Sequence, residues 1–207
     1  MDPSVTDGDS VWALSLAEFR DATAADRPTP GCGAAAAVAS DIGLALVLKG
    51  LRISEARSSE PARRRLLQVA ESLIGRPGAF ADADIRAFQE YLQASHHQTA
   101  AADLQAASRQ VCAVPLATAR SCLKALELAN EAWPLVAAVV RSDIQAGALL
   151  IHAGLRAALI NVEADLGSIE DNQSREQVAQ LHRRLRSEAD GLLQRLTGMA
   201  EQSDSRN

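Results

Sequence analysis

Apolar residues recur at intervals of three and four along most of this chain, and one such run lies between Ser142 and Leu166. This spacing places the apolar side chains on one face of an α-helix. The serine and Gln145 form a capping-box pattern in front of the run, so we expect the helix to begin near Asp143. Small residues on its face, including Gly147 and Gly154, let another helix approach closely.

The same pattern predicts an all-α protein. Start and stop signals bound six further helical segments, at residues 15–23, 34–54, 60–75, 82–95, 100–131 and 174–199. No internal repeat or interdomain linker separates them, so we expect a single-domain helical bundle of about six to seven helices over residues 11–200. Residues 1–10 are expected to form a flexible N-terminus and residues 201–207 a disordered tail, because both segments are polar and terminal.

Prolines and glycines mark two boundaries in this pattern. The segment Pro28 to Gly33 reads PTPGCG, which excludes regular helix and allows close backbone approach, and an apolar helix follows from Ala34. Free backbone N–H groups at that helix start are suited to holding an anion or a carbonyl group. The triplet Arg76-Pro77-Gly78 is a helix stop, so the next helix is expected to begin between Asp82 and Asp84.

Composition narrows the class of function. The chain has 207 residues, 47% of them hydrophobic and only 3% aromatic, which favours closely packed helices over a β-sandwich or barrel. The net charge of −5 gives no reason to expect binding to nucleic acid or to acidic membranes. The apolar run from Ala34 to Leu51 carries Asp41 and Lys49, so we expect a buried helix and no membrane span.

The three cysteines, Cys32, Cys112 and Cys122, fit neither a paired disulfide framework nor metal-ligand spacing. No basic segment followed by an apolar run opens the chain, so we expect no secretory signal. These features predict reduced thiols in a cytoplasmic protein without a metal site.

Four segments together resemble the cyclodeaminase/cyclohydrolase family, and they occur in that family's order. The first is the turn PTPGCGAAAA, similar to the family's P-x-P-G-G-G-S/A-A-A pattern. The others are Asp84 to Phe88, similar to D-x-x-A-F, then Val114-Pro115-Leu116, and finally the segment that begins SDIQAGALLIHAGLRAALINVEADL. The resemblance covers roughly Ser15 to Asp171.

The resemblance implies a homodimeric helical bundle that holds folate at or near the subunit interface. It implies chemistry on the one-carbon bridge between N5 and N10 of tetrahydrofolate. We place hydrolysis of 5,10-methenyltetrahydrofolate to 10-formyltetrahydrofolate first, because no formiminotransferase domain accompanies this chain. Cyclisation of 5-formiminotetrahydrofolate with loss of ammonia is the alternative. The folate is a substrate, and neither reaction requires a metal or a prosthetic group.

Two aspartates are candidates for the catalytic carboxylate, Asp84 and Asp143, since a carboxylate is able to place water and hold a cation. Both also fit the simpler interpretation of an acidic residue in the first turn of a helix. The candidates for substrate binding are Pro30, Gly31, Cys32, Gly33, Asn161 and Asp165. Tight packing of the turn and hydrogen bonding of Asn161 to another helix are their structural alternatives.

Some positions depart from the family pattern. Cys32 replaces the middle of three glycines, Asp165 stands where the family has asparagine, and lysines expected after the second helix are missing. These departures keep two further possibilities open. One is a family member with an altered substrate, and the other is a non-catalytic helical binding or assembly protein. His152 is expected to be a hydrogen-bonded core or interface residue, and Arg63 to Arg65 a solvated face.

Overall fold

The computed structural model describes residues 10–96 and 100–204, which contain helices and no strand. This confirms the all-α prediction. Seven α-helices form the bundle: α1 (Leu16–Thr23), α2 (Cys32–Arg57), α3 (Pro61–Leu73), α4 (Arg76–His96), α5 (Ala101–Ala132), α6 (Arg141–Asp165) and α7 (Asn172–Asp204). Four 3-10 turns join or extend them: η1 (Val11–Ala13), η2 (Trp133–Leu135), η3 (Ala138–Val140) and η4 (Leu166–Ser168).

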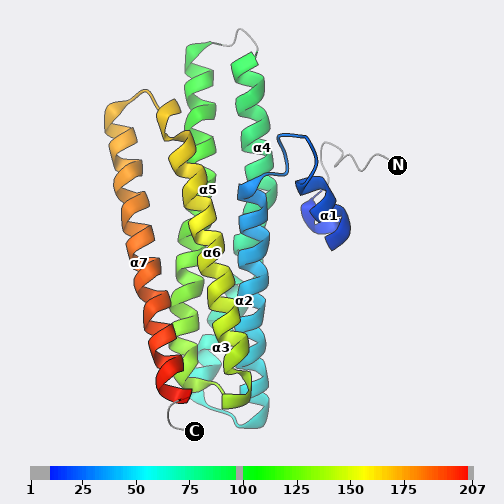
Figure 1. The fold of residues 1–207 in the computed structure, drawn as a ribbon, viewed down its shortest axis with the longest axis vertical. Helices are drawn as coiled ribbons and strands as arrows, with labels where there is room; N and C mark the ends of the chain where they lie inside the picture. The colour runs from blue at the N-terminus through cyan, green and yellow to red at the C-terminus, as the bar shows by residue number, and fades with distance from the viewer. Residues whose placement is uncertain (1–9, 97–99, 205–207) are drawn as a thin grey trace.

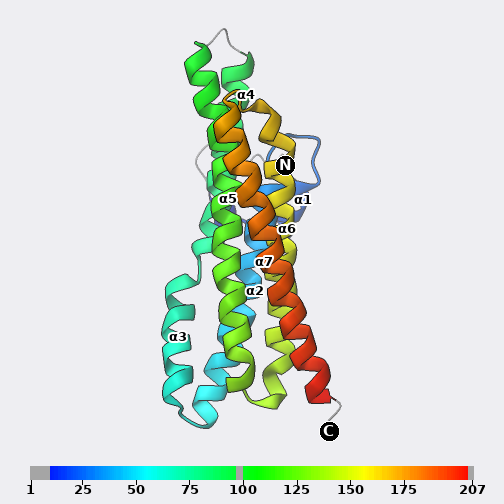
Figure 2. The same cartoon turned by 90° about the vertical axis from the view of Figure 1, so that its left-hand side faces the viewer.

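The long helices α2, α5, α6 and α7 run along the long axis of the bundle (Figure 1). Helices α3 and α4 follow one another along that axis, so that α3 lies beside one end of the bundle and α4 beside the other (Figure 2). The main core fills the space between the long helices. Its largest fully buried side chains include Leu44, Leu51, Leu126, Ile144, Ile151, Leu155 and Leu159. The apolar faces read from the sequence are therefore the faces that meet.

Helices α2 and α6 are antiparallel and pack backbone against backbone. A Cβ atom on Gly43 would lie 2.7 Å from the Gly147 carbonyl oxygen, and one on Gly147 would lie 2.5 Å from the Gly43 carbonyl oxygen. No side chain fits in such a space, so the small face predicted on α6 is confirmed. The antiparallel register brings the start of α2 to the end of α6.

The start of α4 corrects the sequence prediction. Arg76-Pro77-Gly78 does not stop a helix but forms the first turn of α4, six residues or more before the expected start. The carboxylate of Asp41, which lies on α2, accepts hydrogen bonds from the backbone N–H groups of Gly75 and Gly78. A partner 34 residues away in sequence therefore satisfies the free donors of this helix start.

Other helix ends agree with the sequence in part. Ser15 and Glu18 form the expected capping box of α1. The box predicted at Ser142 is absent, because α6 begins at Arg141 and Val140 takes the cap position. Helix α7 continues beyond Met199 to Asp204, so the first four residues of the predicted tail are helical. Residues 1–9, 97–99 and 205–207 lie outside the described residues, and with them most of the predicted flexible N-terminus.

Two helical segments are long and apolar enough to cross a membrane by composition alone, Cys32–Arg57 and Ala138–Ser168. In the first, 61% of the most apolar stretch is buried inside the bundle, as expected for a core helix. In the second the buried share is 44%. Helix α6 therefore presents an apolar outer face in addition to the face that meets α2.

Candidate functional site

A pocket of about 280 Å³ lies where the start of α2, the middle of α4 and α5, and the end of α6 come together. Figure 1 shows these segments side by side near the place where the chain enters α2. The residues that line the pocket are Pro28, Thr29, Gly31, Cys32, Asp84, Phe88, Val111, Asn161 and Asp165. None of them is a lysine, an arginine or a histidine. The pocket therefore combines an apolar wall with two carboxylates, an amide and a thiol.

Asp84 enters this pocket from the third turn of α4, and not from a helix start as the sequence suggested. Its carboxylate accepts a hydrogen bond from the backbone N–H of Ala34 in the first turn of α2. A Cβ atom on Gly33 would lie only 2.0 Å from Asp84 Oδ1. The glycine-rich turn thus makes room for the Asp84 carboxylate, and one of its free N–H groups is already satisfied by a protein side chain.

The pKa of Asp84 is raised to about 6, chiefly because burial disfavours the charged carboxylate. The nearby charge of Asp165 raises it further, whereas the hydrogen bonds from Ala34 and Asn161 oppose the shift. A carboxyl group with this pKa exchanges its proton close to neutral pH. It is therefore suited to general acid–base chemistry.

Asn161 connects Asp84 to Cys32 across the pocket. Its Nδ2 group donates to Asp84 Oδ1 at 3.4 Å, and its Oδ1 atom accepts from the Cys32 thiol at 2.7 Å. Burial and the negative charge of Asp84 raise the pKa of the Cys32 thiol, which favours the protonated donor. The amide is thus oriented by a donor on one side and an acceptor on the other.

Asp165 lies one helical turn beyond Asn161 on α6. Burial raises the pKa of its carboxyl group as well. The pKa of Cys112, on the adjoining helix α5, is raised to about 11 by burial and by the Asp165 charge. Asp165 therefore places a second negative charge beside the first.

Five of the predicted site residues line this pocket together: Asp84, Gly31, Cys32, Asn161 and Asp165. Gly33 and Pro30 are buried beside it, in the same turn. The fold does not place Asp143 in this pocket. It pairs with Lys49 at 3.1 Å, and the eighteen residues between Asp143 and Asn161 span roughly 27 Å along α6. The Asp143 carboxylate therefore cannot contact a ligand atom in the pocket.

Two basic groups singled out in the sequence also lie elsewhere. His152 hydrogen-bonds to Asp190 of α7 through Nε2 at 2.8 Å, which confirms the expectation of a satisfied histidine. Arg63 is only 4% exposed and pairs with Glu60 and Glu55, so the predicted solvated face is wrong for this residue. The cause is that α3 folds back against the end of α2.

The apolar wall of the pocket was not predicted from the sequence. Phe88 follows Asp84 by four residues, so both lie on the same side of α4, and this spacing is a signal in the sequence itself. Val111 belongs to α5 and is brought to the pocket by tertiary packing. An aromatic ring and a branched side chain give a flat heteroaromatic ligand a surface to contact.

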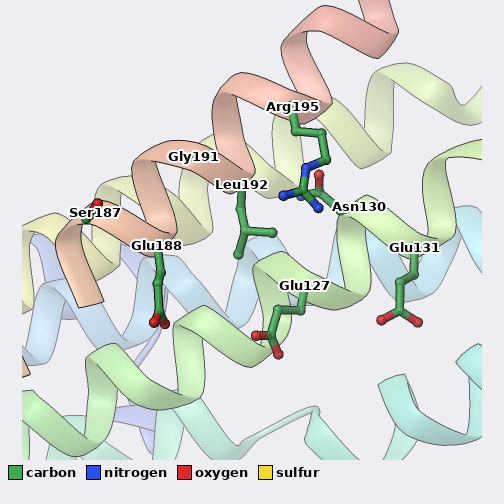
Figure 3. A pocket seen from close by; sticks show the side chains of 8 residues that line it. All are labelled: Glu127, Asn130, Glu131, Ser187, Glu188, Gly191, Leu192 and Arg195. Atoms are coloured by element: carbon green, nitrogen blue, oxygen red, sulfur yellow. The ribbon is translucent and has the colours of Figure 1, made fainter. Parts of the chain in front are cut away.

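A larger groove of about 600 Å³ lies between α5 and α7 (Figure 3). Glu127, Glu131 and Glu188 line it together with Arg195 and the buried Asn130. It holds none of the residues that the sequence singled out. We therefore place the candidate site in the smaller pocket. Among the residues that the structure describes, no cluster of His, Cys, Asp and Glu is arranged to hold a metal ion.

The family model described as formiminotransferase-cyclodeaminase matches residues 15–184, which include every residue that lines the pocket. The chain belongs to the formiminotransferase-cyclodeaminase family. This finding agrees with the resemblance seen in the sequence motifs.

Three relatives of this family member are informative. It is 29% identical to the methenyltetrahydrofolate cyclohydrolase of Methylorubrum extorquens, over 88% of this chain and 93% of that protein. It is 31% identical to the formimidoyltransferase-cyclodeaminase of Sus scrofa, over 73% of this chain but only 30% of that protein. The crystal structure of formiminotetrahydrofolate cyclodeaminase from Thermotoga maritima superposes with a TM-score of 0.87 at 25% identity, covering 93% of this chain and 98% of that chain.

Proposed function

We propose that this protein hydrolyses 5,10-methenyltetrahydrofolate to 10-formyltetrahydrofolate in the pocket beside Asp84. The observation that carries the proposal is a half-buried carboxyl group with a pKa of about 6 in a pocket without basic side chains. The match to the cyclohydrolase of Methylorubrum extorquens over nearly its whole length supports this choice of reaction. Folate is the substrate, and the chemistry needs neither a prosthetic group nor a metal.

The reaction adds water to a carbon that is already electrophilic, because the methenyl bridge carries a delocalised positive charge. The ionised Asp84 takes one proton from the attacking water as the new C–O bond forms. It then returns a proton to N5 as the C–N5 bond breaks, and the remaining hydroxyl proton is lost to solvent. The product is a neutral formyl group on N10, with one proton released overall.

The volume of the pocket limits how much of the substrate it is able to enclose. Pockets for drug-sized ligands occupy roughly 300–1,000 Å³. A pocket of about 280 Å³ is suited to the reacting head group alone. The Phe88 ring and Val111 offer an apolar surface to the pterin, while the glutamyl end extends out of the pocket along the protein surface.

The cyclodeaminase reaction is the second candidate, favoured by the structural match to the Thermotoga maritima enzyme. In that reaction N10 attacks the formimino carbon and ammonia leaves. Asp84 is placed to accept the N10 proton and then to protonate the departing nitrogen. The same pocket and the same carboxylate serve either substrate, because both present a cationic one-carbon unit.

The protein is further proposed to be a cytoplasmic homodimer that binds neither nucleic acid nor membranes. The outer face of α6 carries Leu149, Leu150 and Ile160, which are 50%, 36% and 64% exposed, and Ile42 of the adjacent α2 is 42% exposed. Several exposed large apolar residues on one helix pair are typical of an interface. Asn161 and Asp165 lie next to it on α6, so a second copy placed there borders the pocket.

The interface is tested by Ile160→Glu, which puts a charge on the most exposed apolar residue of this face. We expect a monomer by sedimentation velocity, because burying an unpaired carboxylate opposes association. Val69→Glu is the matched control, since Val69 is 45% exposed on α3 and lies away from this face. Monomeric protein before substitution would refute the proposed dimer.

The activity is tested by following the absorbance of the methenyltetrahydrofolate chromophore with purified protein, against a control without enzyme because buffer hydrolyses this compound. Saturable acceleration establishes the cyclohydrolase. The reverse signal, chromophore formed from 5-formiminotetrahydrofolate, establishes the cyclodeaminase. If the folded protein binds reduced folates but accelerates neither reaction, the remaining possibility is an enzyme with an altered substrate. If it binds no folate, the remaining possibility is a non-catalytic helical binding protein.

A further inference from the structure

Asp84 and Asp165 bring two carboxylates into one small pocket without a compensating cation. No ion pair joins either of them to a basic side chain within residues 10–96 and 100–204, and no basic residue lines the pocket. Another half-buried acid of the bundle has basic partners. Asp190 contacts His152 at 2.8 Å and Arg156 at 3.0 Å. The pocket therefore holds uncompensated negative charge within the described part of one chain.

The two carboxylates differ in how they are held. Asp84 is fixed by the Ala34 backbone N–H and by the Asn161 amide. No hydrogen bond to the Asp165 carboxylate occurs within the described part of the chain, and burial is the sole cause of its raised pKa. Asp165 thus has its acceptor oxygens available, while Asp84 is oriented for proton transfer.

Uncompensated charge in a half-buried pocket is stabilised most by a ligand of opposite charge. The substrate of the proposed reaction carries a positive charge on its one-carbon bridge, and its product carries none there. The electrostatic attraction is consequently present before the reaction and absent after it. A pocket with this property binds the substrate in preference to the product.

We propose that Asp165 is a specificity-determining residue, whose free carboxylate beside Asp84 selects folates with a cationic one-carbon bridge over neutral ones. The inference rests on the proposed function and deepens it. Asp84 carries out the proton transfers, and Asp165 supplies charge. Because the Asp165 charge also raises the pKa of Asp84, its removal has a second consequence in the pH profile.

Asp165→Asn tests the proposal, because it removes the charge and keeps the shape. We expect KM for methenyltetrahydrofolate to rise about tenfold and the inhibition constant of the neutral product to change less than about twofold. The acid limb of kcat/KM is expected to move to lower pH. Glu163→Gln is the matched control, since Glu163 is an exposed acid on the same helix, and it is expected to change none of these quantities.

Equal changes for substrate and product, or no change for either, would overturn the proposal. Circular dichroism and thermal melting check that the variant is folded. A second measurement separates this inference from the proposed reaction. In the Asp84→Asn background, where turnover is suppressed, calorimetry compares the binding of 5,10-methenyltetrahydrofolate with that of 5-formyltetrahydrofolate, with and without Asp165→Asn.

Failure of the unsubstituted protein to turn over methenyltetrahydrofolate or 5-formiminotetrahydrofolate would refute the proposed function and leave this binding comparison standing. A preference for the cationic folate that disappears with Asp165→Asn supports the inference whatever the turnover. Absence of that preference refutes it, even in an active enzyme.

Discussion

The antiparallel pair of α2 and α6 places an acidic residue of α6 near each of its ends, and the two residues have opposite surroundings. Asp143 lies 3.1 Å from the Lys49 ammonium, and the lysine side chain is 54% exposed. Asp165 faces a pocket that holds a second carboxylate, Asp84, and no basic side chain. One end is a solvated ion pair, and the other is a site of uncompensated negative charge.

The difference comes from the elements that close over each end. At the Asp143 end, a lysine of α2 reaches the carboxylate and water still reaches the lysine. At the Asp165 end, α4 and α5 cover the pocket with Phe88 and Val111, so burial raises the pKa of both carboxyl groups. Residue type is the same at the two ends. The role of each aspartate is decided by what encloses it.

The sharpest test of this comparison replaces one carboxylate at each end in turn, Asp84 in the pocket and Asp143 in the ion pair. Asp84→Asn is expected to lower kcat about 10²- to 10⁴-fold, because it removes the proton acceptor. Asp143→Asn is expected to change kcat by less than about twofold, since it removes half of an exposed pair. Steady-state hydrolysis of methenyltetrahydrofolate measures both. Similar losses in the two variants would show that the two ends do not differ in function.

Gly33→Ala tests whether the position of Asp84 matters as well as its charge. The added Cβ would lie 2.0 Å from Asp84 Oδ1, so the carboxylate must move. We expect kcat to fall about 10²-fold and the free energy of unfolding to fall by about 1–3 kcal/mol. At Gly31, where the nearest atom to a Cβ is 3.5 Å away, alanine is expected to leave the free energy of unfolding nearly unchanged.

Chemical denaturation and the kinetics of Gly33→Ala and Gly31→Ala separate these outcomes. A Gly33→Ala protein with unchanged kcat would show that Asp84 tolerates displacement, and its catalytic role would then be in doubt.

The stability of the protein is expected to depend on pH through Asp84. Its folded-state pKa of about 6 lies above the ordinary aspartate pKa of 3.8 expected in an unfolded chain. The protonated group therefore favours the folded state below about pH 4, and this contribution is lost as pH rises through 6. A shift of this size corresponds to at most about 3 kcal/mol.

Urea denaturation between pH 4 and pH 8 measures this dependence. Asp84→Asn is expected to remove it, so the variant becomes relatively more stable than the unsubstituted protein above pH 6. Asp41 also has a raised pKa and remains in both proteins, so its contribution cancels in the difference. Parallel pH profiles for the two proteins would contradict the assignment of a raised pKa to Asp84.

The smallest effect is expected at the ion pair. A double-mutant cycle with Lys49→Ala and Asp143→Asn is expected to give a coupling energy below about 1 kcal/mol that decreases with added salt. Thermal denaturation at low and high ionic strength measures it. A coupling of several kcal/mol would show that this end is shielded from solvent after all.

Much of the fold was predictable because helix formation leaves a local signal. The apolar spacing identified the long helices, and the Ser15 and Glu18 pair marked the start of α1. The start of α4 was not predictable in this way. Arg76-Pro77-Gly78 stops a helix when only its neighbours are considered, and it starts one here because Asp41 of α2 accepts from Gly75 and Gly78. Leu16, an apolar residue of α1, is 76% exposed because α1 lies at the edge of the bundle.

Part of the site was also predictable, through the motifs that resemble a known family. Asp84, Cys32, Asn161 and Asp165 were singled out from their motifs and lie together. Asp143 came from the same motif as Asn161 and lies elsewhere, because a helix separates the two ends of one motif by its length. A motif identifies residues, but it does not show which of them the fold encloses in one pocket.

The sequence by itself determined that this chain folds as a helical bundle, because the period of apolar residues is a property of neighbouring positions. It also determined which polar residues stand on otherwise apolar faces. The tertiary structure alone decided which of these share a pocket and how far burial raises their pKa values. Proximity and desolvation arise from segments far apart in the chain, and no local pattern records them.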